Sequence, residues 1–165
     1  METLYTVLVV WLMSSAALGV GSSTLAVASF LTALKDGTID PSERRMLGVV
    51  YTSLRAAMVM IAIALLCLNF VYDDPVTGIE YLWFLLAMLT INSFLMTKHW
   101  ISFKLGPALQ AATWYTLGFV LSIEAFELID LSWVGMLSLY CIDFIMAVLI
   151  INGLMMWQRS RRKVT

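Results

Sequence analysis

Four ionisable side chains lie inside or at the end of strongly apolar stretches of this sequence. Arg55 stands in the middle of VYTSLRAAMVMI, and Asp143 stands in SLYCIDFIMAV. Glu124 and Glu127 lie near the end of another apolar stretch. A charged group inside hydrocarbon is costly, so such groups commonly face a bundle interior or a water-filled cavity, where they bind ions or relay protons. These four residues are therefore the candidate substrate or ion pathway.

Arg55 and Asp143 are predicted to form an ion pair inside the membrane. Arg55 lies nine residues after Met46, where its apolar stretch begins, which is about 14 Å along a helix. Asp143 lies twelve residues after Leu131, where its apolar stretch begins at the opposite membrane surface. This is about 18 Å along a helix. In a hydrocarbon layer ~30 Å thick, Asp143 is therefore roughly 12 Å from the surface at which the stretch of Arg55 begins. A planar guanidinium pairs well with a carboxylate. Such a pair can serve function, or it can simply fix how two helices pack.

The two glutamates form a different group, at the end of a span. Glu124 and Glu127 are three residues apart and share one face of a helix. An acidic rim concentrates cations. Glu124, the deeper of the two, is predicted either to bind a cation or proton or to be structural, whereas a hydrated carboxylate is the simpler interpretation of Glu127. The same side of the chain also carries Asp73, Asp74, Glu80 and Asp130.

The elements that must hold these residues are membrane-spanning helices. Of the 165 residues, 61% are hydrophobic and 13% are charged, which leaves too few polar residues to cover a water-soluble protein of this size. Five apolar stretches each approach the roughly 20 residues that cross a bilayer. The sequence predicts an all-α, polytopic integral membrane protein, a bundle of five transmembrane helices. It forms a single membrane domain over residues 1–165, with spans at about residues 4–34, 46–70, 81–97, 105–129 and 131–157.

Basic residues predict how the five helices are threaded. Lys and Arg occur in the first and third connections and in the C-terminal tail, but not in the second and fourth connections. Cytoplasmic segments are enriched in these residues. We therefore expect the N-terminus outside and the C-terminus in the cytoplasm, in a plasma (inner) membrane. The basic residues on the cytoplasmic side are Lys35, Arg44, Arg45, Lys98, Lys104, Arg159, Arg161, Arg162 and Lys163.

Several polar and small residues are predicted to act in helix packing. Ser15, Gly19 and Ser23 recur every four residues in the first stretch, and such small-residue faces let helices approach closely in lipid. Asn92 and Gln110 lie within the third and fourth spans. We expect them to make hydrogen bonds between helices rather than to bind a ligand.

The connection KDGTIDPSERR, residues 35–45, allows two interpretations. Asp36, Gly37, Asp40 and Glu43 match the second half of an EF-hand calcium loop, but the first two carboxylates of that motif are missing. Asp40 before Pro41, with an acid at Glu43, instead matches the cap of a helix N-terminus. The sequence favours the cap.

Other kinds of site find little support in the sequence. His99 is the only histidine, so one chain cannot offer two histidines to a haem or a histidine-rich metal centre. Cys67 and Cys141 lie in apolar stretches and do not form a CxxC pair. Motifs for a catalytic nucleophile or a phosphate-cradling loop are absent, as is a basic stripe for nucleic acid. We therefore expect no cofactor, no metal, no nucleic acid partner and no catalytic residue.

These observations lead to three functional hypotheses. The first is a small transporter or channel component that moves a cation, a proton or a small solute through a polar site of Arg55, Asp143 and Glu124. The second is a non-catalytic accessory or assembly subunit of a larger membrane complex. The third, an enzyme acting on lipid or quinone, has the least support because the sequence lacks a nucleophile–base pair. The expected partners are the lipid bilayer and either a homo-oligomer or a larger membrane complex.

Overall fold

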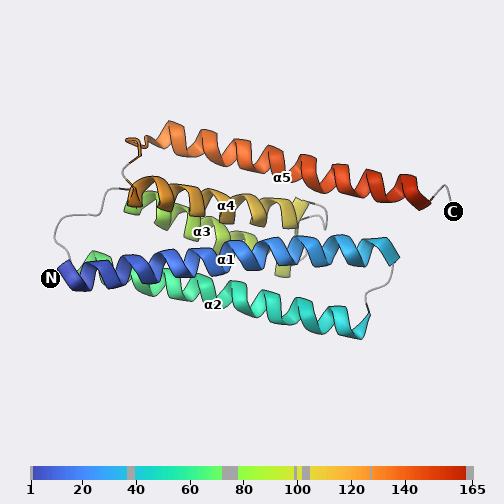
Figure 1. Cartoon of the computed structure of the whole chain (residues 1–165), viewed down its shortest axis with the longest axis horizontal. Coiled ribbons are helices and arrows are strands. Elements are labelled where there is room, and N and C mark those ends of the chain that lie inside the picture. Colours follow the sequence, from blue (N-terminus) through green and yellow to red (C-terminus); the bar gives the residue numbers. More distant parts are fainter. Residues whose placement is uncertain are drawn as a thin grey trace.

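The computed structural model of the chain describes residues 2–36, 40–71, 78–98, 100–101, 105–126 and 128–162. These residues form an all-helical bundle (Figure 1). The helices are α1 (Glu2–Asp36), α2 (Pro41–Val71), α3 (Ile79–Thr97), α4 (Leu105–Ala125) and α5 (Trp133–Arg162). The all-helical prediction is confirmed, and α4 ends at Ala125, before the predicted end of the fourth span.

Four of the helices are long and apolar enough to cross a membrane: Glu2–Ser29 of α1, Pro41–Val71, Ile79–Thr97, and Trp133–Leu154 of α5. This finding supports the predicted class of helical membrane protein. The helix that does not reach this level of hydropathy is α4. Its sequence carries polar residues along its length, among them Gln110, Thr113 and Thr116.

α4 is the most enclosed helix of the bundle. Gln110, Thr113, Trp114 and Thr116 are all buried, as are most of the apolar residues between them. By contrast, only 11% of the apolar stretch of α5 is buried. Other helices therefore form the surroundings of α4, and this is why polar side chains are tolerated there while α5 is apolar on nearly every face.

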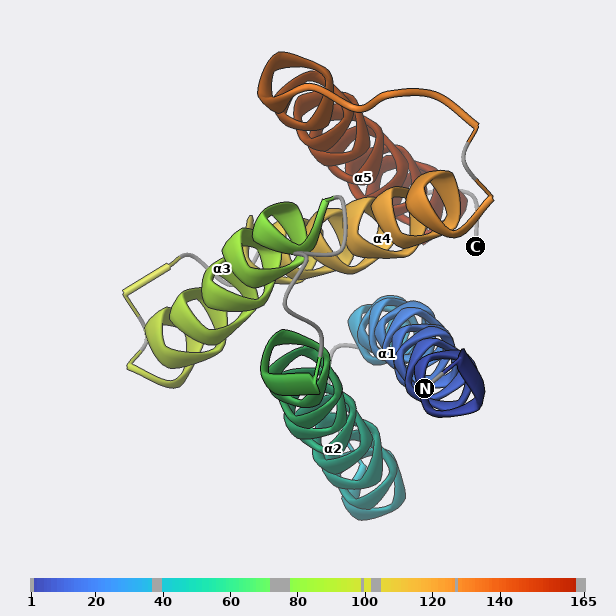
Figure 2. The ribbon, with the colours of Figure 1, turned by 90° about the vertical axis from the view of Figure 1, so that its left-hand side faces the viewer.

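The helices are arranged around α4 (Figure 2). α4 packs against α1, α3 and α5, while α2 packs mainly against α1. α2 and α5 lie on opposite sides of the bundle. α5 begins beside α3, where the Tyr81 hydroxyl donates to the Leu131 carbonyl at 2.6 Å and the Tyr81 and Trp133 rings meet edge to face at 4.8 Å.

α1 and α4 are in tight contact at Gly19. A methyl group on this residue would overlap the ring of Trp114, whose side chain is completely buried. Ser15 and Ser23 are buried on the same helix, and the Ser15 hydroxyl donates to the Trp11 carbonyl at 2.7 Å. The predicted small-residue packing face is therefore confirmed, and its partner is α4 as well as α2.

The first turn of α2 is capped as the sequence predicts. The backbone N–H of Asp40 donates to Glu43 Oε2 at 3.0 Å, and the N–H of Arg44 donates to the Asp40 carbonyl at 2.9 Å. Glu43 thus satisfies a backbone donor that the helix itself leaves free. The carboxylate is engaged in the helix cap.

Two ends of the bundle can be distinguished. We call the end where α1 and α3 finish and α2 and α4 begin the basic end, because the sequence there carries Arg44, Arg45 and Lys98. We call the opposite end, where α3 and α5 begin, the acidic end, because it carries Glu80, Glu124 and Asp130. At the basic end α1, α2 and α5 extend well beyond α3 and α4 (Figure 1).

Candidate functional site

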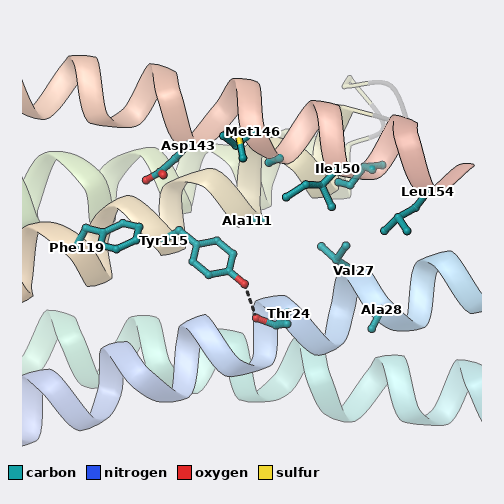
Figure 3. Close-up of a pocket in the computed structure, with 12 residues that line it drawn as sticks. Thr24, Val27, Ala28, Ala111, Tyr115, Phe119, Asp143, Met146, Ile150 and Leu154 are labelled. Atoms are coloured by element: carbon teal, nitrogen blue, oxygen red, sulfur yellow. Dashed lines mark hydrogen bonds between the residues drawn. The ribbon is translucent and has the colours of Figure 1, made fainter.

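A groove near the middle of the bundle lies between α1, α4 and α5 (Figure 3). It has a volume of about 500 Å³, and its lining is mostly apolar. Val27 and Ala28 form the α1 side, Phe119 belongs to α4, and Met146 and Ile150 belong to α5. Three lining side chains carry polar groups: Thr24, Tyr115 and Asp143.

Asp143 is the charged residue of this groove. It lies ten residues into α5 and is half-buried. The hydroxyl of Thr116, a fully buried residue of α4, donates to Asp143 Oδ2 at 2.8 Å. One turn earlier on each helix, the Thr113 hydroxyl lies 3.5 Å from the Tyr140 hydroxyl. The α4–α5 contact therefore fixes one carboxylate oxygen of Asp143 by a charge-assisted hydrogen bond.

A second polar contact crosses the groove from α1 to α4. Thr24 Oγ1 and the Tyr115 hydroxyl are 2.8 Å apart (Figure 3). The Thr24 hydroxyl also lies 2.9 Å from the Val20 carbonyl, which can only accept. Because threonine has a single hydroxyl hydrogen, Tyr115 is the donor of the pair when Thr24 donates to Val20.

The groove continues toward the acidic end. A second cavity of about 530 Å³ lies between α1 and α4 and shares Tyr115 and Phe119 with the first. It reaches Met13 on α1 and Ser122 on α4. The α1–α4 face is thus hollowed from the level of Asp143 to the last turn of α4. We call the two cavities together the Asp143 groove.

Arg55 lies elsewhere, and the predicted ion pair with Asp143 is wrong. Arg55 is exposed on α2 and lines a cavity of about 260 Å³ between α2, α3 and α4. Asp143 instead lines the groove between α1, α4 and α5, and its hydrogen-bond partner is Thr116. Within the described part of the chain, no ion pair joins Arg55 to Asp143.

The two charges also lie at different heights in the bundle. The cavity of Arg55 includes Gln110, five residues after the start of α4, and Thr97, the last residue of α3. Asp143 contacts Thr116, eleven residues after the start of α4. The six-residue difference amounts to about 9 Å along the helix. The sequence estimate failed because it counted depth from the start of the apolar stretch, although α2 extends beyond α3 and α4 at the basic end.

Glu124 is separated from both of these residues. It faces α3, where its carboxyl group packs against Gly78, the residue that precedes α3 and has a φ of +80°. An added Cβ on Gly78 would lie 2.5 Å from Glu124 Oε1. A carboxylate at a helix N-terminus is favourable because the peptide dipoles there are positive. This placement favours the structural interpretation of Glu124, and Glu127 lies outside the described residues.

The predicted polar site of Arg55, Asp143 and Glu124 is therefore not one site. The structure puts each of the three in its own surroundings. Sequence reasoning missed Thr24, Tyr115 and Thr116 as neighbours of Asp143. The sequence does contain a pattern that could have identified Thr116. Gln110, Thr113 and Thr116 recur every three residues, and this spacing puts polar side chains on one side of a helix.

Asn92 and Gln110, which were predicted to make hydrogen bonds between helices, make none among the described residues. Asn92 is buried, and its Nδ2 has no hydrogen-bond partner among the described residues. Gln110 lines the cavity of Arg55. The described part of the chain also contains no group of three His, Cys, Asp or Glu side chains that could hold a metal ion.

Comparison of the chain with models of known protein families, with characterised proteins and with solved structures finds no match.

Proposed function

We propose that all five helices span the membrane, with the N-terminus outside and the basic end in the cytoplasm of a plasma (inner) membrane. The basic residues of the sequence gather on one end, as cytoplasmic segments do. The low hydropathy of α4 is compatible with a span because α1, α3 and α5 surround it. A helix enclosed by other helices does not need an apolar face toward lipid.

We further propose that the protein is a small transporter component whose pathway is the Asp143 groove. The observation that carries this proposal is the position of the Asp143 carboxylate. It lies near the middle of the apolar stretch Trp133–Leu154 of α5, opposite the centre of α4, and lines a groove of about 500 Å³. An ionisable group at such a depth that borders a cavity is a functional candidate by default.

The surroundings of Asp143 favour a particular cargo. A bare metal ion needs several oxygen ligands, and the groove offers one carboxylate and the paired hydroxyls of Thr24 and Tyr115. A proton needs only the carboxylate. An organic cation needs the carboxylate and apolar walls, and the walls include Val27, Phe119 and Met146. The proposed cargo is therefore a proton or a small organic cation with an apolar body.

Flux measurements in reconstituted vesicles test this function. Vesicles containing the full chain and a pH-sensitive dye report proton movement, and uptake of tetraphenylphosphonium reports an organic cation. We expect Asp143→Asn to abolish the flux because the amide keeps the size of the side chain and removes its charge. Asp130→Asn, at an exposed residue outside the groove, is the matched control and should retain the flux. Flux that is equal in both variants would refute the role of Asp143.

An accessory subunit is the second candidate function, and the exposed surface of α5 favours it. Val134, Ile142, Ile145 and Leu149 are more than half exposed. They share one face of the helix, so α5 offers an apolar surface to lipid or to a partner helix. Mass measurement after gentle solubilisation separates the two candidates. A co-purifying, different polypeptide together with flux that does not depend on Asp143 would favour the accessory role.

A further inference from the structure

A second polar cavity lies at the basic end and is independent of the Asp143 groove. It has a volume of about 260 Å³, is open on one side, and is lined by residues of α2, α3 and α4. Its lining combines the Arg55 guanidinium with the hydroxyl residues Tyr51, Ser93 and Thr97 and the amide of Gln110. The Thr97 hydroxyl donates to the Ser93 carbonyl at 2.8 Å. Arg55, Gln110 and the remaining hydroxyls leave several hydrogen-bond donors around one space.

The guanidinium has no carboxylate partner among the described residues. The nearest acids along α2 are at its N-terminus, where Glu43 is engaged in the helix cap. Glu43 precedes Arg55 by twelve residues, which is about 18 Å along the helix. Asp143 is hydrogen-bonded on the other side of α4. The counter-charge of Arg55 must therefore come from outside the described chain or from solvent.

Gln110 provides a second, buried polar group at the same cavity. Its side chain is only 8% exposed, yet it makes no hydrogen bond to any described residue. Gln110 lines the cavity, so its amide can donate to or accept from a molecule bound there. A bound acceptor in the cavity would satisfy both the amide and the guanidinium.

The position of the cavity suits the head group of a lipid. Thr97 ends α3, and the exposed Lys98 that follows it lies with its Nζ 5.7 Å from the Phe94 ring centre. α2 and α3 spread apart toward this end of the bundle (Figure 2). Ile91 and Phe94 of α3 and Val59 of α2 are more than half exposed. An acyl chain can therefore follow the apolar surface of α2 and α3 while its head group enters the cavity.

We propose that the cavity lined by Arg55 and Gln110 binds the phosphate of an anionic lipid head group on the cytoplasmic side. The planar fork of arginine matches phosphate oxygens, and the amide and hydroxyl donors complete the site. Basic pockets between transmembrane helices are suited to such head groups. This site rests on the proposed orientation of the helices in the membrane and does not depend on transport through the Asp143 groove.

Lipid titrations of the purified full chain in detergent, followed by native mass spectrometry, test the site. Phosphatidylglycerol and phosphatidylcholine with identical acyl chains separate an anionic from a zwitterionic lipid. We expect the intact chain to prefer phosphatidylglycerol. Arg55→Gln should weaken this binding by about ten-fold or more, as expected for loss of a hydrogen bond between charged groups. Gln110→Ala should weaken it by a smaller factor.

The control is Arg44→Gln, which removes an exposed positive charge from the first turn of the same helix and should change binding less than two-fold or so. If near-ultraviolet circular dichroism shows that Arg55→Gln does not fold, the lipid titration is made with Gln110→Ala and Arg55→Lys instead. Equal binding of the two lipids, or equal losses at Arg44 and Arg55, would overturn the proposal. A separate titration with inorganic phosphate that displaces the lipid and shows the same Arg55 dependence would assign the site to free phosphate instead.

Discussion

At the scale of single residues, the three charged residues predicted to form one polar site each have different neighbours. Asp143 receives a hydrogen bond from Thr116 across the α4–α5 contact. Arg55 lines a separate cavity beside Gln110, and Glu124 packs on the backbone of Gly78. A charge in a bundle is stabilised by the polar groups that the neighbouring helix presents at its height. The partner of a charged residue is therefore decided by which helix lies beside it, and not by which opposite charge the sequence contains elsewhere.

The contact between Gly19 and Trp114 gives a prediction at the same scale. Gly19→Ala should destabilise the bundle by about 1–3 kcal/mol, the usual cost of forcing an extra carbon into a packed core. The added methyl would overlap a completely buried indole ring. Unfolding in mixed detergent micelles, followed by near-ultraviolet circular dichroism, measures the change.

Gly21→Ala is the matched control on the same helix. Nothing lies within 4 Å of the position that its methyl group would take. Alanine also favours a helix over glycine by up to about 1 kcal/mol. We expect no loss of stability in this variant. If both variants unfold alike, the close α1–α4 approach at Gly19 is refuted.

At the scale of elements, α4 and α5 differ in opposite ways. α5 carries a strongly apolar candidate span that is largely exposed, whereas α4 lacks an apolar stretch of that kind and is the most enclosed helix. The polar face of α4 supplies Thr116 to Asp143 and Gln110 to the cavity of Arg55. In lipid, apolar surface does not drive helices together, so the packed helix is marked by small and hydrogen-bonding residues.

This contrast predicts how the helices insert. As an isolated segment in a translocon insertion assay, residues 105–125 should insert less efficiently than residues 133–154, because its polar side chains are unpaired outside the bundle. In the full chain α4 should insert, since α1, α3 and α5 surround it. The ratio of singly to doubly glycosylated product measures both cases. Efficient insertion of the isolated α4 segment would contradict this explanation.

At the scale of the whole molecule, the proposed five spans would put the two chain termini on opposite sides of the membrane. The proposed orientation puts the connection before α5 outside and the connection before α4 in the cytoplasm. The two connections lie at opposite ends of the structure (Figure 1). An even number of spans would instead return the two termini to one side of the membrane.

Labelling with a membrane-impermeant maleimide checks this topology. In a background with Cys67 and Cys141 replaced by Ser, Ser132→Cys should react in intact cells. Ile101→Cys should react only after the membrane is permeabilised. Ser132 and Ile101 lie in described, non-helical segments at the acidic and basic ends, respectively. Reaction of both positions from outside, or of Ile101→Cys alone, would rule out the proposed orientation.

The helical class and the approximate helix positions follow from the sequence, because they depend on composition and on local patterns. The cap of α2 was predicted from Asp40, Pro41 and Glu43, whose hydrogen bond involves residues only three apart. The small-residue face of α1 was predicted from a four-residue repeat. In each case the physical cause acts within one or two helical turns, and a single sequence records it directly.

The neighbours of each helix were decided only by the tertiary structure. No local pattern predicts that α4 lies between α2 and α5. No local pattern predicts that α1 and α2 extend beyond α3 and α4 at the basic end. Arg55 and Asp143 were matched on depth and charge alone, and they lie on different sides of α4, beside residues of α4 that are about 9 Å apart along the helix. Which polar groups meet in a bundle depends on helix order and relative height, and these are set by the packing of all the helices together.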